Sequence, residues 1–341
     1  MDIKVYKNKG LSGLANLGNT CFINSCIQIL SHTYELSEFL KNGSFRTKLK
    51  NKYDSVLLIE WDNLRKILWN ENCVVSPGKF IKTIHKVSDL KGIEIFTGYT
   101  QNDISEFLLF LIDCFHNSLS RGVKITISGK PENDKDKLAI NCFEMIKNTY
   151  SKDYSEIWNL FYAVHVSEIV RVDNGKILSV KPEPYFIINL PIPPNNKHPS
   201  LIDCFNHYVE GESINDFKDE NTNEKVTIRK KISFWSFPTI LTIDLKRFNN
   251  KSQKNQIYVN FPINELDLSE YVIGYKKNNY KYELYGVCNH SGSSSGGHYT
   301  AYVKNANEKW YNFNDTSVTE VGLNESIITS KAYLLFYRKK A

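Results

Sequence analysis

The sequence has 341 residues, enough for one large domain or two ordinary ones. Hydrophobic residues make up 41% and charged residues 23%, as in a typical globular protein with a sizeable core. The net charge of +6 comes from lysines scattered along the chain. Because no block of roughly five or six like charges is present, we expect no nucleic-acid partner.

The sequence also argues against a membrane protein or a secreted one. Residues Met1 to Gly10 are polar, and the strongest apolar runs, near Phe107–Ile112 and Tyr333–Tyr337, are far shorter than the ~20 residues of a membrane span. The seven cysteines are widely spread and form no framework of pairs, which favours a reducing compartment. We expect a monomer located inside the cell, in the cytoplasm, the nucleus or both, with no membrane partner.

The first third of the chain is predicted to be mainly helical. One helix follows Asn19 and Thr20, either of which can cap it, because apolar residues then recur at helical spacing. A clearer apolar stripe over Ile104–Phe115 predicts a second helix, which Asn102 or Asp103 can open, and a third helix is expected over Val56–Leu68. The polar segment Arg121–Lys137 is predicted to be a loop or a variable insertion.

From about Phe161 onward, the sequence is typical of β-strands, with β-branched and aromatic residues between turn-forming residues. The expected strands are Tyr185–Leu190, Thr239–Phe248, Tyr280–Cys288, His298–Val303, Lys309–Phe313 and Ala332–Tyr337. A helical part followed by a largely antiparallel β part predicts an α+β fold. A cleft between the two parts can bring residues from both ends of the chain together.

Cys21 is the candidate nucleophile. It follows Gly18-Asn19-Thr20 at the predicted start of a helix, where the partial positive charge of the helix favours the thiolate that attacks carbonyl groups. The alternative is a cysteine that only packs in the core, as Cys26 on the apolar stripe is expected to do.

His298 is the candidate base, because it follows the glycine- and serine-rich run from Ser291 to Gly297. Such a run allows another backbone to approach closely and allows the loop to move. The alternative is a surface histidine beside a flexible loop. Downstream, either Asn314 or Asp315 could hold the second nitrogen of the ring as the third member of a triad.

Several segments resemble, in the same order, the sequence motifs of the ubiquitin-specific proteases. They are Gly13–Ser25, Gln101–Phe107, Leu241–Phe248, Asn289–Tyr302 with Trp310–Val318, and Ala332–Tyr337. The resemblance covers nearly the whole chain, from Leu11 to Tyr337. It implies a papain-like cysteine protease fold with a helical thumb, β fingers and a β palm. The implied divisions are a short lead over 1–10 and a catalytic domain over 11–340, with the thumb at about 11–155, the fingers at about 156–236 and the palm at about 237–340.

The resemblance also implies the catalytic roles. Cys21 would be the nucleophile and His298 the general base, which later acts as the acid. Asn314 matches the position that orients the histidine, and Asp315 matches its acidic neighbour, which can assist. Asn16 matches the residue whose amide stabilises the oxyanion together with the backbone N–H of Cys21. If Asn16 has no catalytic role, it is a turn residue.

A second set of residues would bind the tail of the modifier. Asp103 is similar to the family carboxylate that binds the arginine-bearing tail of ubiquitin, although it can also be a helix N-cap. Gln101 would line the same channel, Tyr299 would contact the terminal glycines, and the loop from His290 to Gly297 would gate the channel. The implied activity is that of a cysteine-type deubiquitinase, whose partners are ubiquitin and ubiquitinated proteins.

The sequence departs from the family pattern at a metal site. Many members bind a structural zinc ion through two Cys-x-x-Cys pairs in the fingers, and such a site needs four ligands. Here the region Val166–Lys225 contains only Cys204, which fits a buried helical position. We therefore expect no metal and no cofactor.

Three alternatives to a deubiquitinase stay open at this point. The chain could be a catalytically weak ubiquitin-binding module, although every catalytic position holds a competent residue type. It could act on another ubiquitin-like modifier, because the motifs around the channel are matched to a shared Gly-Gly tail. A general thiol peptidase is the third alternative, and the motifs outside the triad argue against it.

Overall fold

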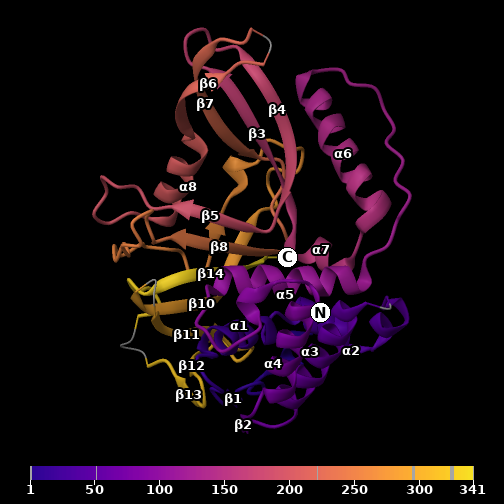
Figure 1. Cartoon of the computed structure of the whole chain (residues 1–341), viewed down its shortest axis with the longest axis vertical. Coiled ribbons are helices and arrows are strands. Elements are labelled where there is room, and N and C mark those ends of the chain that lie inside the picture. The colour runs from indigo at the N-terminus through magenta and orange to yellow at the C-terminus, as the bar shows by residue number, and fades with distance from the viewer. Residues whose placement is uncertain (1, 51, 221, 294–295, 323–325, 341) are drawn as a thin grey trace.

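A helical half and a β half lie against each other in the computed structural model, which describes residues 2–50, 52–220, 222–293, 296–322 and 326–340 (Figure 1). The α-helices are α1 (Cys21–Ser31), α2 (Tyr34–Lys41), α3 (Tyr53–Asn70), α4 (Gly78–Leu90), α5 (Ile104–Leu119), α6 (Asp134–Asp153), α7 (Glu156–Phe161) and α8 (Leu201–Glu210). The strands are β1 (Gly13–Leu14), β2 (Val74–Val75), β3 (Ala163–Arg171), β4 (Ile177–Tyr185), β5 (Ile187–Pro191), β6 (Glu212–Lys218), β7 (Lys225–Phe234), β8 (Ile240–Lys246), β9 (Leu266–Asp267), β10 (Lys281–Ser293), β11 (Gly296–Lys304), β12 (Trp310–Asn314), β13 (Ser317–Glu320) and β14 (Ala332–Lys339). The predicted α+β class is confirmed.

The largest sheet carries one wall of the cleft. Its strands follow the order β13-β12-β11-β10-β14-β8-β5, and β9 pairs with β10 at one end. Among the described residues of this sheet, β5 runs parallel to β8 and the other strand pairs are antiparallel. Helix α1 lies against β10 and β11 because Gly286 lets it approach: a Cβ atom there would lie 3.0 Å from Ile29 Cγ2. The nucleophile helix and the histidine strand are therefore packed directly together.

The second large sheet has the strand order β4-β3-β7-β6 and lies in the part of the chain that the sequence analysis assigns to the fingers, a name kept below for this sheet. Alternate residues of β3 point to opposite faces, so Ala163 packs in the cluster that contains Cys204 of α8, whereas Val164 packs against Cys142 of α6. Cys204 is fully buried on its helix, as expected from the sequence. The range 156–236 that the sequence assigns to the fingers also contains α7, α8 and β5, and β5 belongs to the large sheet.

The predicted helices correspond to α1, α3 and α5, and each predicted strand overlaps an observed one. Thr20 is the N-cap of α1, and Asp103 caps α5. The predicted loop over Arg121–Lys137 is wrong at its end, because α6 already begins at Asp134. Asn133 provides the cap there by accepting a hydrogen bond from the backbone N–H of Asp136. Among the described residues, no helix combines the length and the apolar character that crossing a bilayer requires.

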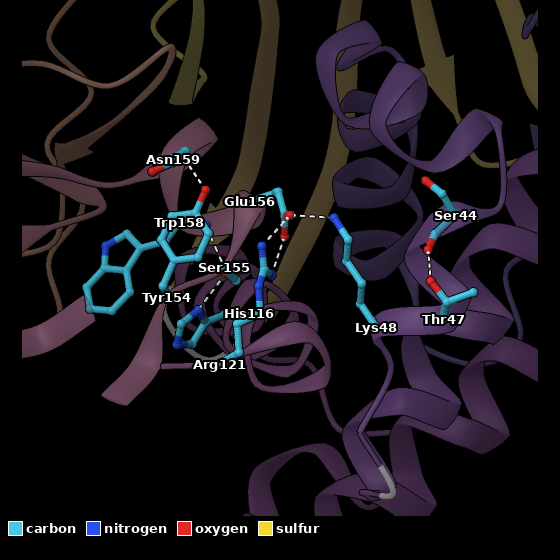
Figure 2. A network of polar contacts seen from close by, with 10 residues as sticks. All are labelled: Ser44, Thr47, Lys48, His116, Arg121, Tyr154, Ser155, Glu156, Trp158 and Asn159. Carbon is cyan, nitrogen blue, oxygen red and sulfur yellow. Dashed lines mark hydrogen bonds and ion pairs between the residues drawn. The ribbon is translucent and has the colours of Figure 1, made fainter. Parts of the chain in front are cut away.

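A polar network connects the inserted segment between Arg121 and Tyr154, which carries α6, to the helical half (Figure 2). Arg121 and Tyr154 exchange two backbone hydrogen bonds of 2.9 and 2.8 Å, which hold the two ends of this segment together. The Glu156 carboxylate accepts two hydrogen bonds from Arg121, of 2.9 and 2.8 Å, and one of 2.7 Å from Lys48. The hydrogen bonds from Arg121, with a smaller contribution from Lys48, lower the pKa of Glu156 to about 2.

We predict that Glu156→Gln destabilises the fold in a pH-dependent way. Because the folded pKa lies below the unfolded value of 4.5, the ionised carboxylate stabilises the protein above pH 4.5 and loses this effect as the pH falls toward 2. After allowance for solvent screening, we expect a loss of about 1–2 kcal/mol at neutral pH. Denaturant unfolding across this pH range would measure it. Glu144→Gln, on the exposed side of α6, is the control, and an equal loss in both variants would contradict the prediction.

Candidate active site

Cys21 is the first residue of α1 and is 2% exposed. Thr20 makes no side-chain cap, because its hydroxyl group donates to Asn16 Oδ1 at 3.3 Å and accepts from the backbone N–H of Leu17 at 3.0 Å. The Thr20 side chain therefore does not occupy the N–H groups of the first turn. These groups can interact with negative charge that develops beside the sulfur atom.

His298 lies on β11 and is held by the end of the neighbouring strand β12. Its Nε2 atom is 2.7 Å from Asn314 Oδ1. Because an amide oxygen only accepts hydrogen bonds, Nε2 carries the hydrogen and Nδ1 of a neutral ring is left as the basic nitrogen. The predicted histidine and one of its two candidate partners are thus brought together.

Gln101 connects the nucleophile to the histidine strand. Its Oε1 atom accepts a 2.6 Å hydrogen bond from the backbone N–H of Gly297, and its Nε2 atom donates to the carbonyl oxygen of Gly297. The same Nε2 atom lies 3.7 Å from Cys21 Sγ. Since Gly297 directly precedes His298, this contact sets the sulfur atom beside the strand that carries the base.

Asp315 organises the other side of the cysteine. Its carboxylate accepts hydrogen bonds from the side-chain amides of Asn16, at 3.0 Å, and Asn24, at 2.8 Å. Asn16 Oδ1 meanwhile accepts from the backbone N–H of Thr20 at 3.2 Å, so both ends of this amide are held. The observed contacts of Asp315 thus go to the proposed oxyanion side. Asn24 was not among the site residues predicted from the sequence, although it is a polar residue in the middle of the cysteine motif.

A cavity of about 530 Å³ lies between α5 and the large sheet, and the carboxylates of Asp103, Glu106 and Asp244 line it. The lining contains no lysine and no arginine. Asp103 uses its two oxygens differently: Oδ1 accepts from the backbone N–H of Ser105 at 2.7 Å, and Oδ2 accepts from the Tyr333 hydroxyl at 2.6 Å. The N-cap role and a position in the cavity are therefore compatible.

Asp244 is an acidic residue that the sequence analysis overlooked. It lies on β8, is half-buried, and accepts a 2.7 Å hydrogen bond from Ser105 Oγ. Burial raises the pKa of Asp244 to about 7, and the nearby Asp103 charge acts in the same direction. A lone carboxylate inside the apolar strand Leu241–Leu245 was the available signal.

The buried side chains of His290 and Tyr299 pack beside Gly297. They are 3% and 4% exposed, and their rings lie 4.6 Å apart. A Cβ atom on Gly297 would lie 2.4 Å from His290 Nε2, so no side chain fits at that position. Burial, together with the charge of Lys254, lowers the pKa of His290 to about 4, which keeps the imidazole neutral at ordinary pH. No pattern in the sequence had pointed to Lys254.

The two hairpin ends, where the resemblance described above places the zinc site of many family members, contain charged groups. Arg171, at the end of β3, makes two hydrogen bonds to Asp173, of 3.1 and 2.7 Å. The same guanidinium lies 3.6 Å from Asp219 and 3.8 Å from Glu224, which follow β6. In the part of the chain that the structure describes, no group of three or more His, Cys, Asp or Glu residues is arranged to hold a metal ion.

A buried thiol at a helix start, a histidine oriented by an amide and donors near the sulfur are the features of a papain-like cysteine hydrolase. The family model "Ubiquitin carboxyl-terminal hydrolase" matches residues 12–337. The chain belongs to this family.

The relatives by sequence include the human ubiquitin carboxyl-terminal hydrolase 2, which is 35% identical over 96% of this chain and 55% of its own length. The chicken protein of the same name is 33% identical over 96% of this chain and 93% of its own length. A probable ubiquitin carboxyl-terminal hydrolase of Acanthamoeba polyphaga mimivirus is 28% identical over 96% of this chain and 90% of its own length. The chain thus spans only about half the length of the human relative.

Among solved structures, a chain of the SAGA Ubp8/Sgf11/Sus1/Sgf73 DUB module bound to ubiquitin aldehyde matches with a TM-score of 0.74 and 23% identity. The match covers 100% of this chain and 72% of that chain. The predicted fold of this family is therefore confirmed.

We predict that Asp244→Asn stabilises the protein at high pH. The folded pKa of about 7 lies above the unfolded value of 3.8, so ionisation of this carboxyl opposes folding above pH 7. The expected gain is about 1–3 kcal/mol above pH 7, and it declines to zero as the pH falls from 7 to 3.8. Thermal or denaturant unfolding at several pH values would measure it. Asp89→Asn, at an exposed position, should show no such trend, and a pH-independent effect of Asp244→Asn would refute the assignment.

We also predict that a chelator leaves the fingers intact, whereas Arg171→Gln loosens them. The Arg171 side chain joins both hairpin ends, so its loss should speed hydrogen exchange at amides such as Val172 N–H, which is bonded to Thr227 O at 3.0 Å. Arg229→Gln, on the neighbouring strand and exposed, is the control. A drop in melting temperature on treatment with 1,10-phenanthroline would instead indicate a bound metal.

Proposed function

We propose that this chain is a cysteine-type deubiquitinase, which hydrolyses the isopeptide or peptide bond after the C-terminal glycine of ubiquitin. The observation that carries the proposal is the contact of Gln101 with both Cys21 and Gly297. This contact sets the nucleophile beside the strand that carries His298. The family resemblance implies that the tail of the modifier, which ends in two glycines, lies along this strand.

In the first step, the Cys21 thiolate attacks the carbonyl carbon of the last glycine. The carbonyl oxygen becomes an oxyanion, which accepts hydrogen bonds from the backbone N–H of Cys21 and from the amide of Asn16. The C–N bond then breaks, and the protonated His298 gives its proton to the leaving amine. The products of this step are the free lysine or N-terminal amine and a thioester on Cys21.

In the second step, water replaces the amine. The neutral His298 removes a proton from water through Nδ1, the nitrogen that Asn314 leaves free, and the hydroxide attacks the thioester carbonyl. The C–S bond breaks and releases ubiquitin with a free C-terminal carboxylate. Asp315 supports both steps indirectly, because it holds the Asn16 amide at the oxyanion.

The acidic cavity accounts for recognition of the arginine-bearing tail. Asp103, with Glu106 and Asp244 beside it, offers carboxylates without competing lysines or arginines. A guanidinium group forms charge-assisted hydrogen bonds with such carboxylates. Gln101 and Tyr299 would then flank the terminal glycines, and His290 would contribute a polar ring at the edge of Gly297.

We infer that ubiquitin and ubiquitinated proteins are the partners. The fold and family support this assignment, and the structural relative described above is bound to ubiquitin aldehyde. All seven cysteines are free thiols, which fits the proposed location inside the cell. The monomeric state stays a prediction.

The altered fingertip favours one second candidate, which is hydrolysis of another ubiquitin-like modifier. The channel is suited to a Gly-Gly tail whatever domain precedes it. At the tip of the fingers, Arg171 lies near Asp219 and Glu224, where the resemblance implies zinc ligands in many family members. The two candidates therefore differ in which folded modifier binds outside the channel.

The decisive test is covalent labelling by ubiquitin that carries an electrophile at its C-terminus, with a second modifier probe in parallel. We expect the purified chain to be labelled by ubiquitin and Cys21→Ala to lose all labelling. Cys73→Ala, which removes an exposed thiol, should be labelled like the wild type. A folded protein that ubiquitin fails to label would refute the proposal, and labelling by the other modifier alone would support the second candidate.

A further inference from the structure

One short segment before α5 contacts three successive parts of the cleft. Asp103 lines the acidic cavity, where its Oδ2 atom accepts the hydrogen bond from Tyr333. Two residues earlier, Gln101 Nε2 lies 3.7 Å from Cys21 Sγ. Two residues earlier again, Tyr99 lies beside the loop that precedes Cys21. The segment therefore leads from the acidic cavity, past the sulfur atom, to a surface beyond the nucleophile.

The ring of Tyr99 is exposed, yet its position is fixed. The side chain is 55% exposed, and its Cδ1 atom lies 3.5 Å from the place that a Cβ atom on Gly18 would occupy. The carbonyl oxygen of Tyr99 accepts a 3.0 Å hydrogen bond from Asn19 Nδ2, and the ring stands edge-on to the ring of His85, with centroids 5.1 Å apart. A ring that is already ordered can bind an apolar chain with little further loss of entropy.

Leu17 extends this surface along α4. It is 36% exposed, and its Cδ1 atom lies 3.6 Å from the Cβ position of Gly78, at the start of α4. His85, which contacts Tyr99, lies two turns farther along the same helix. Burial lowers the pKa of His85, so its ring is mainly neutral near pH 7. Leu17 and Tyr99 thus present a largely apolar surface on the side of α4.

The geometry of an amide bond directs the leaving amine toward this surface. In a trans amide, the chain before the carbonyl carbon and the substituent on the nitrogen atom extend in opposite directions. Under the proposed function, the tail lies on the side of Asp103 and its last carbonyl group lies at Cys21. The amine then leaves on the other side, where Tyr99 lies. The stem of a lysine side chain is about as long as two residues of extended chain, roughly 6–7 Å, which matches the two-residue step from Gln101 to Tyr99.

We propose that Leu17 and Tyr99 form a subsite for the leaving group, in which the methylene stem of the modified lysine packs on the Tyr99 ring and the Leu17 side chain. The inference rests on the proposed function and adds the part of the substrate that lies beyond the scissile bond. Neither side chain takes part in the chemistry. Because a lysine stem buries apolar surface here and a shorter amine does not, the subsite favours lysine isopeptides.

The test compares two substrates that share ubiquitin and differ only in the leaving amine. In one, the C-terminal carboxyl group of ubiquitin is joined to the ε-amine of Nα-acetyl-lysine amide, and in the other it is joined to methylamine. Both are amides of alkylamines and release the same ubiquitin carboxylate, which mass spectrometry measures. We expect the wild type to have a kcat/KM about 5- to 20-fold higher for the lysine conjugate.

Variants of the surface should change this preference. We expect Tyr99→Ala to reduce the ratio of the two kcat/KM values about 3- to 10-fold and Leu17→Ala to reduce it about 2-fold. Tyr99→Phe keeps the ring and should retain the wild-type ratio. Tyr53→Ala, which removes a tyrosine that is 56% exposed at the start of α3, is the matched control and should also retain it. Circular dichroism checks that each variant is folded.

The subsite and the proposed function fail in different ways. If the folded wild type hydrolyses neither conjugate, the proposed function fails and the subsite fails with it. If the wild type hydrolyses both conjugates with equal kcat/KM, the subsite fails and the proposed function stands. A folded Tyr99→Ala that keeps the wild-type ratio would also overturn the subsite. So would an equal fall of the ratio in Tyr53→Ala, because it would indicate a general effect on the fold.

Discussion

The site depends on one contact between the two ends of the chain. The Asp315 carboxylate accepts hydrogen bonds from the side-chain amides of Asn16 and Asn24. The backbone carbonyl oxygen of Asp315 accepts a 2.8 Å hydrogen bond from the backbone N–H of Leu14. Gly13 makes this approach possible, because a Cβ atom there would lie 2.3 Å from the carbonyl oxygen of Thr316. Asp315 itself adopts a left-handed backbone with φ of 49°, which is uncommon for a residue other than glycine. The three hydrogen bonds, which the small size of Gly13 permits, hold the start of α1 against the turn after β12 and offset the cost of this backbone conformation.

The same contact explains why neighbouring residues have different roles. Asn314 lies on the last position of β12 and its side chain reaches His298, whereas Asp315 lies on the turn and its side chain reaches the segment before Cys21. One turn therefore orients the base and the proposed oxyanion donor at the same time. An error in this turn would misplace both sides of the nucleophile, and small displacements of catalytic groups are costly for rate.

The channel combines features that oppose stability. Asp103 and Asp244 lie close to each other without a basic residue in the cavity lining, and the raised pKa of Asp244 reflects this environment. Lys254 is half-buried, and its pKa is lowered by this burial and, to a smaller extent, by the positive charges of Arg247 and Lys331. Groups of like charge that are costly in the folded protein are common at binding sites, because a ligand of opposite or complementary character relieves the cost.

The fingers illustrate how the same architecture can be held by different chemistry. A structural zinc ion contributes folding free energy through short bonds from four ligands. In this chain, Arg171 reaches acidic residues on both hairpins, which is a weaker and more solvent-exposed tie. At the base of the fingers, α6 and α8 pack on opposite faces of the sheet. The apolar side chains buried there stabilise the fingers, whereas the tip is held by charged groups.

The sequence by itself determined the helix of the nucleophile, the strands of the large sheet and the residues proposed for the chemistry, because these depend on local periodicity and on short motifs that resemble those of the family. It also indicated that the usual zinc ligands are missing. It did not determine the start of α6, since the acidic and basic residues over Asp134–Lys137 are equally typical of a loop. The partners of several other polar groups were decided by the tertiary structure. The contacts of Asp315 with Asn16, of Asp244 with Ser105 and of Lys254 with His290 join residues 299, 139 and 36 positions apart. Long-range pairs of this kind follow from how the helices and sheets pack, and short-range patterns carry no information about them.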